Sequence, residues 1–166
     1  GDQLYGGMMG TGDYNCRMET LIDELGIRRQ SMSLGNRDDV EVIYPACDVT
    51  VLSSLYEGTP NVLLESMACG IPVVATDVCD NSYVVKEGET GFLVEVGDVE
   101  GMAGRIKMLL GNDTVRQQMG RKANDWAVNE FSIGQLVRKT ETVYLEALAK
   151  KRSKCRQEPL PIGDIN

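Results

Sequence analysis

The sequence predicts an α/β protein built on a doubly wound parallel sheet. Short apolar, β-branched segments alternate with helical patterns over the first 97 residues, which is typical of parallel strands joined by helices. The segment at 48–53 is apolar and β-branched, as expected for a strand buried on both faces. After Gly97 only helical patterns follow, so extra C-terminal helices should complete the fold.

The first elements are justified by their turn and cap residues. Gly26 suits the C-terminal end of a helix, because glycine adopts the left-handed backbone there without strain. Asp38 and Glu41 form a capping-box pattern at the start of the next helix. The expected elements are a strand at 4–9, a helix at 13–25, a strand at 31–34 and a helix at 38–46.

The second set surrounds the strand at 48–53. Thr59 is a good N-cap, and Pro60 suits the first helical position, where its missing N–H costs nothing. Ser132 and Gln135 form a further capping box. The elements expected here are a helix at 60–69, a strand at 72–75, a helical turn at 82–86, a strand at 92–95 and helices at 99–110, 113–129 and 133–151.

The length of 166 residues fits one domain with a single core. We assign residues 1–151 to that domain and expect 152–166 to be a loose C-terminal tail.

One stretch, 57–65 (EGTPNVLLE), carries the most functional information. The predicted helix start leaves the N–H groups of Asn61 and Val62 unpaired, and with the helix dipole they form a site for a phosphate or diphosphate. Glu57 precedes this site and Glu65 follows it, so the two carboxylates would flank one anion. A diphosphate joined to ribose on one side and to a sugar on the other fits this layout.

Other segments extend the pattern: 33–37 (SLGNR), 46–50 (ACDVT), 67–76 (MACGIPVVAT) and 87–94 (EGETGFLV). In this order and with this carboxylate spacing, the chain resembles the C-terminal, donor-binding domain of GT-B-type retaining glycosyltransferases, glycosyltransferase family 4 (group 1). The resemblance covers residues 4–149. It implies a Rossmann-like fold, the C-terminal half of a GT-B fold.

The resemblance also implies a role for each matching residue. Glu65 would bind the ribose hydroxyls, and Glu57 would contact the transferred sugar near the reacting carbon, as the catalytic residue. The donor-binding residues would be Gly58, Thr59, Pro60, Asn61, Val62 and Glu65, with Gly12, Gly35 and Asn36 on other loops. No cofactor and no metal would be needed.

The implied activity is that of a hexosyltransferase, which moves a sugar from a nucleotide-diphosphate donor to a hydroxyl acceptor with retention. Polysaccharide or glycolipid synthesis is the expected setting. Family members open this domain with a Gly-Arg turn and a nearby Lys, and nothing before Gly10 matches that basic pair. We therefore expect a fragment that lacks its first strand-helix unit and an N-terminal acceptor domain, and that is inactive alone.

Several alternatives stay open. Gly12 and the pair Gly35 and Asn36 are as well explained by plain turns, and Gly12 lacks the third glycine of a dinucleotide fingerprint. Asp80 and Asn81 occupy a loop where many relatives carry a different sequence ending in Glu, so contact with the sugar is a further interpretation there. A GT-B-like epimerase or phosphorylase, or a non-catalytic nucleotide-binding or interaction module, would share much of the pattern.

The net charge of −8 argues against nucleic acid as a partner. The segment 150–156 (KKRSKCR) nevertheless holds five basic residues. They fit a solvated helix end whose cations complement the dipole, and they also fit contact with anionic lipid headgroups.

The chain contains five cysteines without a C-x-x-C pair, and no histidine. The cysteines indicate a reduced, cytoplasmic setting, and the four in helical or strand-end positions are expected to be small apolar fillers. Without histidine, His-based triads and most zinc sites are excluded. Glu57 is then the only local candidate for a nucleophile, while same-face attack would need none.

Overall fold

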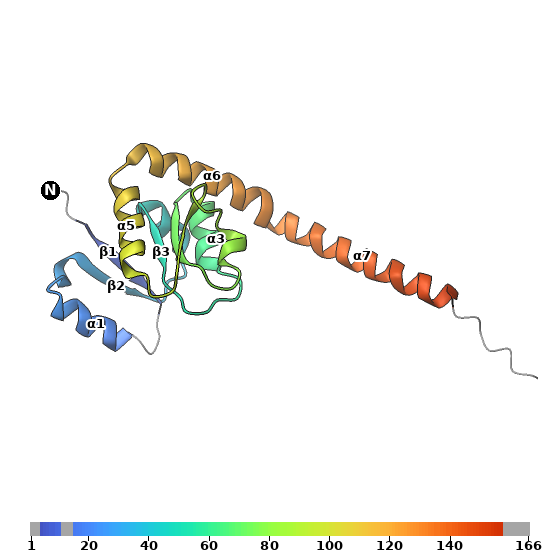
Figure 1. Cartoon of the computed structure of the whole chain (residues 1–166), viewed down its shortest axis with the longest axis horizontal. Helices are drawn as coiled ribbons and strands as arrows, with labels where there is room; N and C mark the ends of the chain where they lie inside the picture. The colour runs from blue at the N-terminus through green and yellow to red at the C-terminus, as the bar shows by residue number, and fades with distance from the viewer. Residues whose placement is uncertain (1–3, 11–14, 158–166) are drawn as a thin grey trace, which may run out of the picture. The chain divides into compact units, whose positions relative to one another are not determined.

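The computed structural model describes residues 4–10 and 15–157, with side chains at 4–10 and 16–151. It divides into two compact units, Gly1–Ile43 and Tyr44–Asn166, and each is described by itself. Both units contain parallel strands joined by helices, so the predicted α/β class is confirmed (Figure 1).

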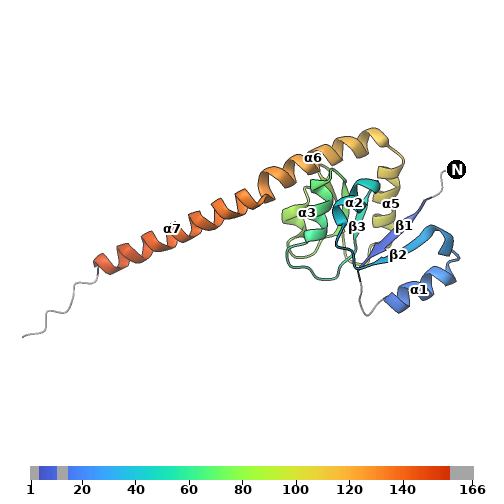
Figure 2. The same ribbon diagram turned by 180° about the vertical axis from the view of Figure 1, so that it is seen from behind.

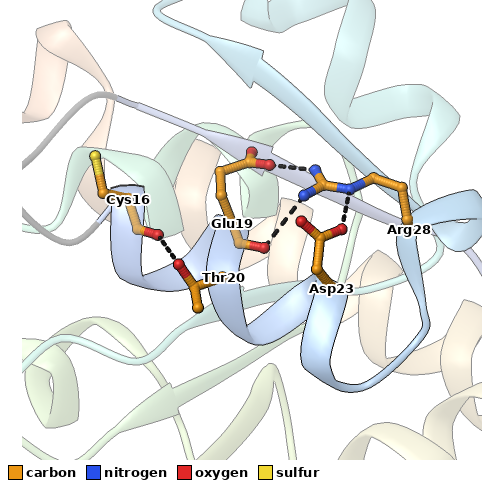
Figure 3. Close-up of polar contacts among 5 residues, drawn as sticks. All are labelled: Cys16, Glu19, Thr20, Asp23 and Arg28. Atoms are coloured by element: carbon orange, nitrogen blue, oxygen red, sulfur yellow. Dashed lines mark hydrogen bonds and ion pairs between the residues drawn. The ribbon is translucent and has the colours of Figure 1, made fainter.

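The first unit contains a two-stranded parallel sheet. Strand β1 (Gly6–Met9) pairs with β2 (Ser31–Gly35), and helix α1 (Asn15–Glu24) and the 3₁₀ turn η1 (Arg28–Gln30) lie between them in sequence. The Arg28 guanidinium holds α1 by bonds to the carboxylates of Asp23 and Glu19 (Figure 3). A short helix α2 (Val40–Ile43) ends the unit.

The second unit is built on a three-stranded parallel sheet in the order β3-β4-β5. These strands span Thr50–Leu52, Val73–Thr76 and Gly91–Val94, and all four residues of β4 are buried. Helices α3 (Asn61–Ala68) and α5 (Val99–Leu110) lie on opposite sides of this sheet in both views (Figures 1 and 2).

Alternate residues of β4 face two different cores, because successive side chains of a strand point to opposite faces. Val73 and Ala75 pack with Leu63 and Met67 of α3. Val74 faces the other way, and its core is completed by Phe92, Leu109 and Met119. Helices therefore cover both faces of this sheet, which confirms the doubly wound arrangement for the second unit.

The helices α4 (Asn81–Val84), α6 (Asp113–Phe131) and α7 (Ile133–Gln157) complete the second unit. Trp126 of α6 is partly buried against the first core, and its Nε1 donates to the Val84 carbonyl at 2.9 Å. In the described part of the chain, no helix is long and apolar enough to cross a membrane.

Several boundary predictions were wrong. The helix expected at 38–46 is divided into α2 and a 3₁₀ turn, η2 (Tyr44–Ala46), because Pro45 removes an N–H and disfavours helical backbone before it. By contrast, α7 begins at Ile133, as predicted, directly after the extended backbone of Ser132. The helix α7 continues to Gln157, past the boundary placed at 151, and residues 158–166 lie outside the described chain.

Candidate functional site

The candidate site lies at the carboxyl end of β3 and β4. Because the two strands are parallel, the loop 53–60 and the loop 77–80 leave the sheet at the same edge. The Thr76 hydroxyl joins them by donating to the Ser54 carbonyl oxygen at 2.6 Å. The Asn81 side chain then donates to the Thr76 carbonyl oxygen at 2.8 Å, so a buried amide supports the junction.

The Glu57 carboxylate is held within its own loop. It is half-buried, and its Oε1 accepts a hydrogen bond of 2.5 Å from the Ser54 hydroxyl. Ser54 is itself fixed through the Thr76 contact, so the Glu57 carboxylate is attached to the end of the sheet by two successive hydrogen bonds. A carboxylate held in this way offers its remaining lone pairs to a hydroxyl or a cation.

The Glu65 carboxylate lies on α3 and is exposed. Its Oε2 accepts from the Tyr44 hydroxyl at 3.3 Å. Tyr44 itself is only 1% exposed. Burial of the phenol, followed by the charge of Glu65, raises the pKa of Tyr44 to about 12, so the hydroxyl keeps its proton at neutral pH.

The start of α3 differs from the prediction in one residue. The N-cap is Pro60 with ψ 83° and not Thr59, and no side chain caps the helix. The Asn61 N–H already donates to the Thr59 carbonyl at 3.0 Å, so the expectation that it is unpaired was wrong. Among the described residues the Val62 N–H has no acceptor, as predicted.

Two buried hydroxyls fix α3 on β3. Ser66 of α3 donates to the Thr50 hydroxyl of β3 at 2.8 Å, and both residues are buried. Pro60 is also fully buried, whereas Gly58, Thr59 and Asn61 are exposed. The helix start therefore presents its polar backbone to solvent while its base is anchored.

The loop after β4 contains one backbone outlier. Cys79 has φ 47°, in the left-handed region that favours glycine, and its side chain is exposed. Cys16, in helix α1, is exposed as well, so the expectation of an apolar filler is wrong at Cys16. Asn81 is fully buried: its Nδ2 donates to the Thr76 carbonyl oxygen, whereas its Oδ1 has no hydrogen-bond partner among the described residues.

The three other predicted donor contacts belong to the first unit. Gly12 lies outside the described residues. Gly35 ends β2 with φ +62°, and its carbonyl oxygen accepts from the Gly10 N–H at 2.8 Å. Asn36 follows it and is exposed. The turn geometry predicted for Gly35 is thus present.

Sequence reasoning missed Tyr44, Ser54 and Thr76, the hydroxyl residues that support the site. Their partners are revealed only by the fold, because the pairs Tyr44–Glu65 and Thr76–Ser54 are separated by more than 20 positions. In the described residues no group of three or more Cys, Asp or Glu is arranged to hold a metal ion. The four cysteines that the structure describes form no disulfide with one another.

Comparison with known proteins gives consistent matches. The family model described as "Glycosyl transferases group 1" matches residues 4–126. N-acetyl-alpha-D-glucosaminyl L-malate synthase of Bacillus anthracis is 33% identical over 141 residues, which cover 85% of this chain and 37% of that protein. The lipopolysaccharide core biosynthesis glycosyltransferase LpsE of Rhizobium meliloti is 32% identical over 148 residues, or 89% of this chain and 42% of that protein.

A solved structure shows the same architecture. The crystal structure of Anabaena Alr3699/HepE in complex with UDP-glucose has a TM-score of 0.80 and 26% identity, and the match covers 86% of this chain and 41% of that one. The chain therefore spans about two fifths of the length of these relatives. With the family model matching most of the chain, this protein belongs to the group 1 glycosyltransferases, and its fold is the Rossmann-like, C-terminal half of a GT-B fold.

Proposed function

We propose that this chain is the donor-binding part of a retaining glycosyltransferase and that it binds a nucleotide-diphosphate sugar through the site at the end of β3. The observation that carries the proposal is the pair of carboxylates, Glu57 and Glu65, each held by a hydroxyl on either side of a helix start. The HepE structure contains UDP-glucose, which supports a uridine nucleotide as the first ligand to test.

In this proposal the Glu65 carboxylate accepts hydrogen bonds from the two ribose hydroxyls, a bidentate geometry that suits a carboxylate. The diphosphate lies at the start of α3, where the Val62 N–H is available and the helix dipole favours negative charge. The Asn61 N–H would exchange its short contact with the Thr59 carbonyl for a phosphate oxygen. Gly58, Thr59 and Pro60 line the approach.

Glu57 is proposed to hold hydroxyls of the transferred sugar. The sugar bond to the diphosphate breaks while the bond to the acceptor oxygen forms on the same face, and the acceptor proton passes to the departing phosphate oxygen. The backbone N–H groups at the helix start stabilise the charge that develops on that phosphate. This route needs no histidine, which the chain lacks, and no metal or cofactor.

The acceptor is proposed to bind a separate N-terminal domain, and the product to belong to polysaccharide or glycolipid synthesis. LpsE, a lipopolysaccharide core glycosyltransferase, supports this setting. The chain alone should then release no UDP from UDP-glucose above the uncatalysed rate. Turnover by the chain alone would contradict the need for a second domain.

Calorimetric titration with UDP, GDP and ADP tests the donor site directly. At least one nucleotide should bind, and Glu65→Gln should weaken it by about 10-fold or more, because bonds to a charged acceptor contribute about 1.5–3 kcal/mol. Glu141→Gln, on the exposed face of α7, is the matched control and should bind like the parent. A folded parent that binds none of the three nucleotides would overturn the proposal in favour of an interaction module.

A further inference from the structure

We propose that Tyr44 is a positioning residue for nucleotide recognition: its hydroxyl holds the Glu65 carboxylate in the orientation that accepts both ribose hydroxyls. The inference rests on the proposed function and goes beyond it, because Tyr44 belongs to none of the segments that carry the family resemblance. It assigns part of the ribose affinity to a residue that is buried and touches no ligand.

The geometry places a rigid donor against a flexible acceptor. Tyr44 is 1% exposed, and its carbonyl oxygen also accepts from the Cys47 N–H at 2.9 Å, so both its ring and its backbone are fixed. Glu65 is exposed and would otherwise sample several rotamers. The phenol therefore restricts a side chain that the helix alone leaves free.

The contact leaves acceptor capacity for a ligand. An ionised carboxylate has about four lone-pair sites, and Tyr44 occupies one of them, on Oε2. The observed bond goes to Oε2, which leaves Oε1 and the second lone pair of Oε2 as the acceptors proposed for two neighbouring hydroxyls, the pattern that a ribose 2′,3′-diol presents.

The separation of 3.3 Å is longer than the usual ~2.7–2.8 Å for a hydroxyl donor. Hydrogen bonds of this kind are often long without ligand and shorten when the ligand is bound. Burial and the Glu65 charge keep the phenol protonated, because they raise the pKa of Tyr44 to about 12. The donor is therefore present over the whole neutral range.

The test compares UDP with 2′,3′-dideoxy-UDP on the whole chain, by calorimetry. The parent should bind UDP more tightly than the dideoxy nucleotide. Tyr44→Phe removes only the hydroxyl. It should weaken the affinity for UDP by about 3- to 10-fold and change the affinity for the dideoxy nucleotide by less than about 2-fold. Tyr144→Phe, at an exposed position on α7, is the matched control and should leave both affinities unchanged.

Two further variants separate positioning from a structural role. In a Glu65→Gln background, Tyr44→Phe should add no further loss, because the two residues act as one unit. Glu65→Asp keeps the charge but shortens the side chain away from Tyr44, and should lose ribose selectivity although Tyr44 stays in the core. This variant remains informative if Tyr44→Phe fails to fold.

The outcomes distinguish the two proposals. A parent that binds UDP and the dideoxy nucleotide equally well overturns the ribose role of Glu65 itself. A selective parent whose Tyr44→Phe variant is equally selective overturns the inference about Tyr44 alone. An equal loss for both nucleotides would also overturn it, since Tyr44 would then support the pocket rather than the ribose contact.

Discussion

Replacing Gly120 with alanine should destabilise the second unit, although alanine is the better helix former. Gly120 lies in α6 where it crosses the end of α3, and a Cβ there would sit 2.0 Å from the Gly70 carbonyl oxygen and 3.1 Å from its carbon. These are backbone atoms, and Gly70 is itself held at φ +77° after the end of α3. Because the close atoms of Gly70 belong to the backbone, no change of side-chain rotamer can relieve the overlap.

The magnitude follows from this overlap. Real Cβ atoms essentially never approach closer than 3.0 Å, so α6 must move away from α3 by about 1 Å. Overpacking costs about 1–3 kcal/mol, and a backbone clash belongs at the upper end. The higher helix propensity of alanine offsets about 1 kcal/mol of this cost. We expect a net loss of about 2 kcal/mol, or a decrease in Tm of about 4–8 °C.

Trp126 provides the assay, because it is the only tryptophan and lies on α6. Urea unfolding followed by its fluorescence reports the unit that carries the site. Gly104→Ala is the matched control: Gly104 is also helical, a Cβ there meets nothing within 4 Å, and the variant should gain about 0.5–1 kcal/mol. If Gly120→Ala were as stable as Gly104→Ala, the close contact between α3 and α6 would be refuted.

Three further predictions concern the site and α7. At Cys79, with φ 47°, Cys79→Gly should exceed Cys79→Ala in stability by about 1 kcal/mol in urea unfolding, and equal stability would exclude a left-handed backbone there. Because the pKa of Tyr44 is raised to about 12, the folded state keeps a proton that the unfolded state loses above pH 10. The free energy of unfolding, measured by urea unfolding, should thus decrease from pH 10 to 12 by at most about 2 kcal/mol, and Tyr44→Phe should remove this part of the decrease. If the free energies of parent and variant decreased in parallel with pH, the raised pKa of Tyr44 would be contradicted. Sedimentation with lipid vesicles distinguishes the two interpretations of 150–156. Binding to phosphatidylglycerol vesicles but not to phosphatidylcholine vesicles, weakened by the double substitution Lys150→Ala/Lys151→Ala, would support contact with anionic lipid. Absence of binding to both kinds of vesicle would support a solvated helix end.

The sequence was sufficient for the elements whose signals are local. The helix at 99–110 was predicted with its observed ends, and both are fixed by local residues: the Asp98 side chain accepts from the Gly101 N–H, and Gly111 is the C-cap. The strand at 48–53 was predicted too long, since a strand ends where its partner ends, and only Thr50–Leu52 has a partner in β4. Periodicity contains no information on that partner.

For the candidate site, too, the local features were predicted and the contacts between distant residues were not. The spacing of Glu57 and Glu65 and the helix start between them are local, and the structure contains both. The cap was placed on Thr59 because it is the better capping residue, but Pro60 has a non-helical ψ of 83° and takes that position. The hydroxyls of Tyr44 and Thr76 could not be assigned, because their partners are distant in sequence and depend on the packing of α3 and β4 against β3.

Those hydroxyls explain why the two carboxylates form one site and not two exposed acids. Tyr44 precedes β3 and holds Glu65, whereas Ser54 follows β3 and holds Glu57. The Thr50–Ser66 bond fixes α3 on the same strand, so β3 sets the distance between the two acids. A ligand that reaches from one carboxylate to the other then meets side chains that are already ordered, and ordering them is a cost that binding would otherwise have to overcome. The three-residue strand β3 is therefore the frame of the proposed donor site, and changes in its packing should affect both ends of the ligand together.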